Sequence, residues 1–344
     1  MKAVVFESTG APDSVLSIKD VPEPEPKHGQ VKVRMLCCPV NPSDLMFVRG
    51  QYTLSAECPA TPGFEGVGIV EAAGGGLRAK MMLGKRVAVL SRRGGNWAEK
   101  NTVPATQVIP FSPLLTGSLS REDQATFFVN PATAFVMTRH VLRVPRGEWL
   151  LETAAGSVLG QMIIRLGKRY GFRTLCVVRR EEQVAELQAV GADAAIWFDP
   201  ARHSAEDFRA AVATATGSSE DRSVIRHAVD CVGGVTGSAV VSTLGQHARM
   251  LLFGTLSGEP LQIPSRALMT PGASITGFWL GNYMETLKLP AKLKLVRSVS
   301  GLIREGVLAS EIGASFPLEE ITAAVQAAET PGRGGKVLLN IGQD

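Results

Sequence analysis

The stretch that decides the fold is WLLETAAGSVLG, residues 149–160. Residues 149–153 form a short apolar run typical of a buried strand, and the pattern over 160–170 predicts a helix. Between them lies a turn of small residues, which lets backbone amides approach a pyrophosphate while the helix N-terminus supplies partial positive charge. We therefore predict a nucleotide-binding unit of strand, turn and helix at this point of the chain.

The turn matches the dinucleotide-binding pattern G-x-G-x-x-G imperfectly. Aligned on Gly160, the chain has Ala155 and Ser157 in place of the first two glycines, with Gly156 between them. An ordinary tight strand-to-helix turn is the alternative interpretation. The surrounding strands and helices favour the nucleotide site, and its predicted cofactor-binding residues are Ala155, Gly156, Ser157, Val158, Leu159 and Gly160.

Strands and helices alternate after this turn. Such alternation predicts an α/β fold whose doubly wound parallel sheet is covered by helices on both faces. The predicted elements are strand 174–178, helix 181–190, strand 194–198, helix 205–215, and strands 227–232 and 249–253.

The two ends of the chain have a different pattern. The first part is rich in short strands separated by Gly and Pro turns, which predicts an irregular, mostly antiparallel β domain. Strands are predicted at 1–6, 31–36, 63–73, 86–90, 274–279 and 336–341, and a helix at 285–304. We expect residues 1–123 to begin this β-rich domain, residues 124–270 to form the nucleotide-binding domain, and residues 271–344 to complete the first domain.

Composition excludes several classes of protein. The 344 residues are 45% hydrophobic, which is enough for two domain cores, and the net charge of +4 is too small to indicate nucleic-acid binding. The five cysteines show no disulfide framework, so a reducing compartment is expected. Residues 1–6 read as a strand rather than a targeting signal, and no apolar run is long enough to span a bilayer. We predict a cytoplasmic protein with no nucleic-acid or membrane partner.

The residues after the second strand of the nucleotide domain indicate which cofactor binds. A protein that binds NAD carries an acidic residue there for the ribose 2′-hydroxyl, whereas this chain has Arg179 and Arg180. Guanidinium groups pair with a 2′-phosphate, so the sequence favours NADP(H). The alternative is that both arginines are solvated and balanced by Glu181 and Glu182.

No metal or nucleophile motif is present. The sequence lacks H-E-x-x-H, C-x-x-C, a P-loop and G-x-S-x-G, and its five histidines are scattered, so no metal site is predicted. Polarising a substrate oxygen or supplying a proton then falls to hydroxyls, amides and backbone groups. Tyr52 follows a turn at 49–51 that could expose its hydroxyl, and a packing role is the alternative.

Seven short motifs together resemble the medium-chain dehydrogenase/reductase superfamily, over essentially the whole chain. That resemblance implies a GroES-like β-rich catalytic domain, split between the two chain ends, and a Rossmann domain. Within the superfamily the chain is similar to zinc-independent 2-enoyl thioester reductases of the mitochondrial type, with quinone oxidoreductases as near relatives. The motifs are VNPSD (40–44), RGQY (49–52), GFEG (63–66), GNW (95–97), VNPATA (129–134), CVGG (231–234) and GFWL (277–280).

The resemblance also assigns roles. Tyr52 would orient the thioester and donate or relay a proton, and Asn41 would lie beside the nicotinamide. The chain departs from the pattern at Gly156, where such reductases tend to carry Asn, and from zinc dehydrogenases at Asn41 and Phe64, where those carry Cys and His. The other residues implied on the cofactor side are Asn130, Thr133, Cys231, Val232, Gly233, Gly254, Phe278, Trp279, Leu280 and Lys336.

The expected activity is NADPH-dependent reduction of the α,β double bond of an enoyl thioester of coenzyme A or acyl carrier protein, as in fatty acid metabolism. An NADPH:quinone or enone oxidoreductase of the same fold, and a catalytically silent NADPH-binding scaffold, are the alternatives. The basic residues Lys288, Lys292, Lys294 and Arg297 either attract a phosphorylated substrate or acidic carrier, or form a solvated helix face. A homodimer is expected, through an exposed edge of the nucleotide-binding sheet.

Overall fold

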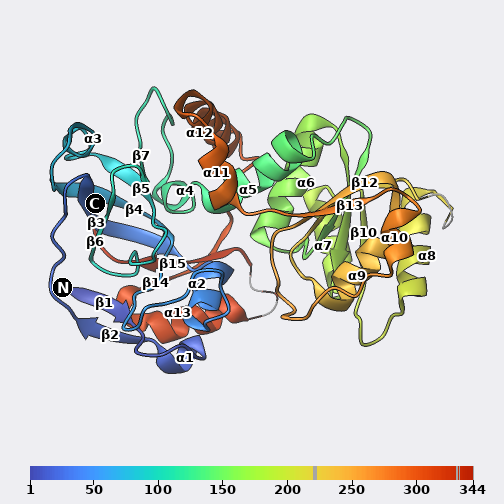
Figure 1. The fold of residues 1–344 in the computed structure, drawn as a ribbon, viewed down its shortest axis with the longest axis horizontal. Coiled ribbons are helices and arrows are strands. Elements are labelled where there is room, and N and C mark those ends of the chain that lie inside the picture. Colours follow the sequence, from blue (N-terminus) through green and yellow to red (C-terminus); the bar gives the residue numbers. More distant parts are fainter. Residues whose placement is uncertain (220–222, 331, 333, 344) are drawn as a thin grey trace. The chain divides into compact units, whose positions relative to one another are not determined.

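A computed structural model describes residues 1–219, 223–330, 332 and 334–343. The chain forms two units that are described separately below (Figure 1). One unit contains Met1–Val129, Val296–Arg304 and Ala309–Asp344, and the other contains Asn130–Leu295 and Glu305–Leu308. The first unit is therefore built from both ends of the chain, and the second from its middle.

The second unit contains a six-stranded parallel sheet in the order β10-β9-β8-β11-β12-β13. All five residues of the central strand β8 are buried. The chain proceeds from β8 toward one edge and then returns to β11 and the other edge, so the strand order reverses between β8 and β11. The strands are β8 (Trp149–Thr153), β9 (Arg173–Val178), β10 (Ala194–Trp197), β11 (Ile225–Asp230), β12 (Leu244–Leu252) and β13 (Ser274–Gly277).

Both faces of this sheet are packed against helices. Leu151 and Val177 belong to a core with Phe208 and Val240 on helices α8 and α9, whereas Cys176 packs with residues of α6 and α7 on the opposite face. The predicted α/β class with a doubly wound parallel sheet is confirmed. The helices are α5 (Val129–Phe135), the π-helix η1 (Val136–Val141), α6 (Val158–Tyr170), α7 (Glu182–Val190), α8 (Ala205–Thr216), α9 (Gly234–Ser242), α10 (Ser265–Met269), α11 (Leu280–Thr286) and α12 (Leu289–Arg304).

The first unit contains a seven-stranded sheet with the path β14-β15-β3-β4-β5-β7, and β6 pairs with β3. Every pairing is antiparallel except that of β14 with β15. A two-stranded ribbon of β1 and β2 accompanies it. The strands are β1 (Lys2–Val5), β2 (Ser17–Asp20), β3 (Gln30–Pro39), β4 (Glu65–Ala73), β5 (Arg86–Leu90), β6 (Lys100–Pro104), β7 (Val108–Pro110), β14 (Ile312–Pro317) and β15 (Lys336–Asn340).

The core of the first unit is closed by residues from both chain ends. Trp97 and Phe6 are fully buried in it, together with Val325 on α13 and Leu339 on β15. None of the helices in the described ranges is long and apolar enough to cross a membrane. The helices of this unit are α1 (Pro12–Val15), α2 (Pro42–Val48), α3 (Leu77–Lys80), α4 (Arg121–Ala125), the short 3-10 helix η3 (Leu318–Glu320) and α13 (Ile321–Glu329).

Several features differ from the sequence-based expectation. Residues 271–295 belong to the second unit rather than to the returning segment, because β13 pairs with β12. The helix predicted over 285–304 is two helices, since the chain is extended at Leu287, between α11 and α12. Helix α9 was not predicted, because it is apolar on all sides and follows two glycines that read as a turn. Strand β14 and helix α13 were likewise not predicted.

The contact between β8 and α6 gives a test of the fold. A Cβ at Gly160 would lie 2.4 Å from the Ala155 carbonyl oxygen and 2.6 Å from its Cα, so only glycine fits. We expect Gly160→Ala to lower the free energy of unfolding by about 1–3 kcal/mol, as overpacking does. Gly277→Ala, where a Cβ meets nothing within 4 Å, should change it little. Urea unfolding of both variants checks this, and equal midpoints would contradict it.

Candidate active site

The turn after β8 is shaped by its small residues. Ala154 adopts a left-handed backbone conformation with φ of 51°, and Ser157 is the N-cap of α6, its Oγ accepting the Gly160 N–H at 3.1 Å. The first turn of α6 thus begins directly after the end of β8, at the point where the strand order reverses. The free amides of a helix N-terminus at such a place suit a phosphate group.

A buried carboxylate fixes the neighbouring loop. Asp230, fully buried at the end of β11, accepts the Thr153 hydroxyl at 2.5 Å and the backbone N–H groups of Val232 and Gly233 at 3.0 Å each. The Thr153 Oγ in turn accepts the Cys231 N–H at 3.2 Å. The ends of β8 and β11 are therefore held together through side chains. Asp230 was not predicted from the sequence, although a carboxylate directly after the apolar pair Ala228 and Val229 at the end of a strand was an available signal.

The chain brings most of the predicted cofactor residues of this unit to the carboxyl ends of its parallel strands, and the exceptions are Asn130 and Thr133 on α5. Residues 155–160 follow β8, Arg179 and Arg180 follow β9, and residues 231–233 follow β11. Gly254 follows β12 and approaches Cys231 so closely that a Cβ would lie 2.8 Å from its carbonyl oxygen. Residues 278–280 follow β13. All of these lie at carboxyl ends of parallel strands, where ligands of open α/β sheets bind.

The two arginines after β9 differ in their surroundings. Arg179 is exposed, and its carbonyl accepts the Trp197 indole N–H at 3.0 Å. Arg180 forms an ion pair with Glu182 at 3.1 Å, with a side chain 35% exposed. For Arg180, this ion pair corresponds to the alternative given in the sequence analysis, in which a nearby glutamate balances the arginine. An exposed pair of this kind contributes little to stability, so it leaves the guanidinium available to a phosphate.

A side chain that the sequence analysis did not select covers the glycine-containing turn. A Cβ at Gly156 would lie 2.4 Å from the Gln183 Nε2 atom. Gln183, on α7, therefore places an amide directly over the turn. In this structure the Gln183 amide occupies the space that a side chain at residue 156 would need.

The segment after β13 continues into an aromatic cluster. The Phe278 N–H donates to the Leu252 carbonyl at 2.7 Å, and Trp279 is 39% exposed and so is not a core residue. Tyr283 on α11 lies with its ring centroid 6.3 Å from that of Phe278, and its hydroxyl hydrogen-bonds to His140 Nδ1 at 2.9 Å. Burial, followed by the charge of Lys294 and nearby arginines, lowers the pKa of His140. Asn130 and the buried Thr133 lie on α5, before this cluster's π-helix.

The first unit contains a buried polar cluster around Asn41. The Lys336 ammonium donates to Asn41 Oδ1 at 2.6 Å, and the Asn41 amide lies 3.5 Å from Glu65 Oε2. Glu65 Oε1 accepts the N–H groups of Phe128 and Val129 at 2.7 and 2.8 Å. Lys336 is only 4% exposed. The resemblance places Lys336 on the cofactor side, and in this structure its ammonium is turned inward to Asn41.

Asp44 completes this cluster. It is fully buried and accepts the Asn41 N–H at 2.8 Å and the Phe64 N–H at 2.9 Å. Burial raises the pKa of Asp44 to about 7, opposed by those two hydrogen bonds and by the charge of Lys336. Burial also raises the pKa of Glu65. Asn41 is thus the N-cap residue of α2 and is held by Lys336, Glu65 and Asp44. No local pattern indicated that the two acids would be buried.

Tyr52 lies next to this cluster through Phe64. The two rings are 5.3 Å apart between centroids, and Tyr52 is partly buried against the core of the first unit. Asp44 holds the backbone of Phe64, and Phe64 supports the Tyr52 ring. The structure therefore brings Tyr52 and Asn41, the two predicted catalytic residues, into one connected group of side chains.

The residues that the structure describes do not fit a catalytic zinc ion. Burial raises the pKa of the Cys37 thiol to about 12 and that of Cys38 well above its ordinary value, so neither is a thiolate. The Cys38 Sγ donates to the Asn96 carbonyl at 3.2 Å. In the described ranges, no three His, Cys, Asp or Glu side chains lie close enough together to hold a metal.

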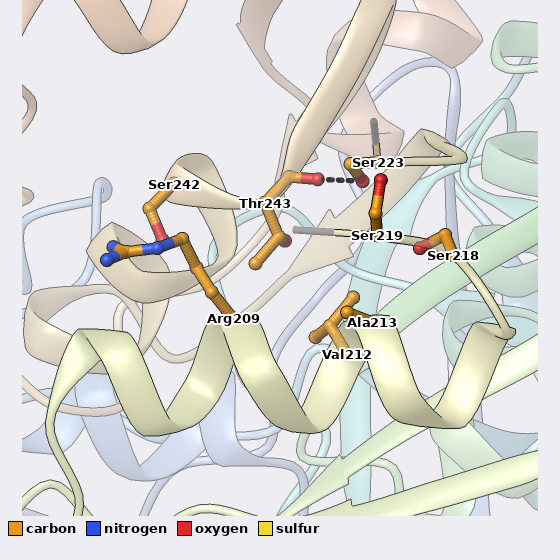
Figure 2. A pocket seen from close by; sticks show the side chains of 8 residues that line it. All are labelled: Arg209, Val212, Ala213, Ser218, Ser219, Ser223, Ser242 and Thr243. Atoms are coloured by element: carbon orange, nitrogen blue, oxygen red, sulfur yellow. Dashed lines mark hydrogen bonds between the residues drawn. The ribbon is translucent and has the colours of Figure 1, made fainter. Parts of the chain in front are cut away.

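Two hollows in the second unit lie away from the predicted residues. One, of about 10 Å³, has room for about one water molecule and is lined by hydroxyl groups beside α8, where the Ser223 hydroxyl donates to the Thr243 carbonyl at 2.5 Å (Figure 2). The other, of about 350 Å³, is lined by Arg226, His227 and Arg249, near the amino ends of β11 and β12. Neither includes a residue of the candidate site.

Comparisons with known proteins agree with this geometry. Residues 27–113 match the alcohol dehydrogenase GroES-like domain, and residues 158–296 match the zinc-binding dehydrogenase family. The chain is 28% identical to a mitochondrial enoyl-[acyl-carrier-protein] reductase of Xenopus tropicalis, covering 98% of this chain and 95% of that protein. It resembles a mycobacterial structure solved with NADPH, with a TM-score of 0.86, 26% identity and coverage of 99% and 100%. A mycobacterial quinone oxidoreductase gives a TM-score of 0.83, with 26% identity and 99% coverage of both chains.

The raised pKa of Asp44 predicts how stability depends on pH. Between its ordinary value of 3.8 and about 7, the folded chain binds more protons at this carboxyl than the unfolded chain does. Its contribution to the free energy of unfolding therefore falls as pH rises through this range. Asp44→Asn should remove that dependence, flattening the pH profile by up to about 1.4 kcal/mol per pH unit.

The matched control is Asp207→Asn on α8. Hydrogen bonds from Ser204 lower the pKa of Asp207 below its ordinary value of 3.8, so this carboxyl is ionised in both the folded and the unfolded chain above about pH 5, and its loss should leave the slope between about pH 5 and 7 unchanged. Chemical unfolding of both variants at several pH values between 4 and 7 measures these slopes. A profile of Asp44→Asn parallel to that of the wild type would show that Asp44 is not the group responsible.

Proposed function

This chain belongs to the medium-chain dehydrogenase/reductase superfamily, and we propose that it is an NADPH-dependent, zinc-independent reductase of 2-enoyl thioesters. The observation that carries the proposal is that the chain has two features together, one in each unit. One is the row of predicted cofactor residues at the carboxyl edge of the parallel sheet. The other is the group formed by Tyr52, Phe64 and Asn41 in the first unit.

The second unit supplies a binding place of the right chemistry for NADPH. The amides at the start of α6 and the loop held by Asp230 suit the pyrophosphate. Arg179 and Arg180 are placed after β9, where the adenosine ribose is recognised in this fold, and would pair with the 2′-phosphate. NADPH, when bound, supplies the hydride that reduces the β-carbon of the substrate.

The first unit supplies the groups that handle the substrate. Reduction at the β-carbon places negative charge on the thioester carbonyl oxygen, and a hydrogen-bond donor aimed at that oxygen is worth about 3 kcal/mol. The Tyr52 hydroxyl is proposed to hold the thioester and to give or relay the proton that the α-carbon receives. Asn41, fixed by Lys336, is proposed to position the neighbouring backbone rather than to transfer a proton itself.

The second candidate function is reduction of quinones or enones with NADPH. It is favoured by the similarity to a mycobacterial quinone oxidoreductase over 99% of the chain. Both reactions deliver a hydride to an electron-poor carbon–carbon or carbon–oxygen π system, so the same residues serve either one. The third hypothesis is a catalytically inactive scaffold that binds NADPH.

Three further expectations stay predictions. A homodimer through the exposed edge strand β13 is one. A cytoplasmic location is the second. The third concerns the basic residues Lys288, Lys294 and Arg297, which are exposed on or before α12 and are placed to meet a phosphorylated substrate or solvent.

A substrate panel with a tyrosine variant tests the proposal. We expect the wild type to oxidise NADPH with short enoyl-CoA thioesters faster than with quinones. Tyr52→Phe should lower kcat by about 100-fold while leaving NADPH affinity unchanged, because loss of a general acid acts on the chemical step. Tyr170→Phe, in the second unit beside Arg139, is the control and should retain full activity. Turnover of quinones alone would establish the alternative, and unchanged kcat in Tyr52→Phe would remove the role of Tyr52.

Cofactor preference gives a separate test. Replacing both Arg179 and Arg180 by Ser should raise the KM for NADPH by about 10–100-fold, because hydrogen bonds to a charged partner are lost, and leave the KM for NADH nearly unchanged. Arg202→Ser, which removes an exposed arginine elsewhere on this unit, serves as the control. Steady-state kinetics with both coenzymes measures the two KM values for each variant. An equal change for NADPH and NADH would mean that these arginines do not recognise the 2′-phosphate.

A further inference from the structure

The connection between β4 and β5 exposes an unusual number of large apolar side chains. Leu77 is 79% exposed, Met81 56% and Leu83 47%. Two residues of the same segment are buried instead, since Ala79 is 1% exposed and Met82 9%. The adjacent methionines of this segment therefore have opposite environments, and the proposed function uses neither.

These side chains are held outward by an ordered backbone. The Met81 N–H donates to the Leu77 carbonyl at 3.0 Å, and the Leu83 N–H donates to the Lys80 carbonyl at 3.3 Å. The Gly84 N–H donates to the Val70 carbonyl of β4 at 2.9 Å, which fixes the segment to the sheet. Leu77 and Met81 are thus presented from one helical turn, and their exposure is a property of the folded unit.

The charged residues in the stretch of sequence that contains this segment have one sign. Residues 72–98 contain six basic residues and no acidic residue. Of these, Arg78, Lys80 and Lys85 flank the exposed apolar side chains, and the side chains of Lys80 and Lys85 are exposed. The Arg78 Nε donates to the Ala105 carbonyl at 2.8 Å, which holds that guanidinium near the segment. Exposed apolar side chains flanked by cations have the chemistry that binds the interface between lipid phosphates and acyl chains.

We propose that residues 74–85 form a docking surface for an anionic lipid bilayer. Leu77, Met81 and Leu83 enter the interface, and the flanking cations meet the lipid phosphates. An acidic protein would satisfy the cations, but three large exposed apolar side chains in one short connection fit a deformable lipid boundary better than a preformed partner. The sequence-based expectation of no membrane partner rested on the lack of a spanning segment, and surface contact requires none.

Vesicle co-sedimentation of the full-length protein tests this, without substrate or cofactor. We expect binding to phosphatidylcholine vesicles containing about 30% phosphatidylglycerol at about 0.1 M salt, and little binding to pure phosphatidylcholine. Replacing Leu77 and Met81 by Asp should reduce partitioning at least tenfold, since apolar burial is lost and charge repulsion is added. Lys80→Glu should reduce it at least fivefold, because each cation near an anionic surface contributes about a fivefold factor.

Met269→Asp is the matched control, because Met269 is 75% exposed and lies in the second unit. It should bind vesicles as the wild type does. Thermal unfolding and NADPH binding of each variant establish that it is folded. Absence of wild-type binding to the anionic vesicles, or equal binding by the Leu77 and Met81 variant, overturns the proposal. Lys80-dependent binding to acyl carrier protein without vesicle binding also overturns it, and assigns the surface to an acidic protein.

Discussion

The hydrogen bond from the buried Lys336 ammonium to Asn41 joins the two ends of the chain inside the first unit. It links β15 to the start of α2, across nearly the whole sequence. Around it lie two buried carboxylates, Asp44 and Glu65, whose ionised forms need that ammonium nearby. The arrangement of Asn41, Phe64 and Tyr52 depends on this one cation, since Asp44 holds the backbone of both Asn41 and Phe64.

The candidate site residues of the second unit are positioned in a different way. Its candidate residues come from five separate strands, and what unites them is only that each follows the carboxyl end of a parallel strand. Asp230 then fixes the loop after β11 to β8 with one carboxylate. The common direction of the parallel strands thus brings most of the site residues together. The hydrogen bonds of one buried acid, Asp230, then fix one of the loops.

The sequence was sufficient for elements with a strong local pattern. Strand β8 and helix α6 were predicted closely because a buried apolar run and an amphipathic face are local properties. Helix α9 was not predicted because its apolar residues have no preferred face. Residues 271–295 were assigned to the wrong domain because long-range strand pairing decides which sheet a strand joins. The burial of Asp44, Glu65 and Lys336 also depends on segments far apart in sequence, so the inward direction of Lys336 could not be read from the residues around it.

The pairing of β3 with β15 has a consequence for how the protein is made. During synthesis, β3 leaves the ribosome long before β15 exists, so the sheet of the first unit stays incomplete until translation ends. The strands of the second unit are contiguous from β8 to β13, and this unit can fold while the remainder is still being translated. Until β15 is made, residues Cys37–Pro39 of β3 lack their strand partner and expose backbone hydrogen-bonding groups that favour aggregation.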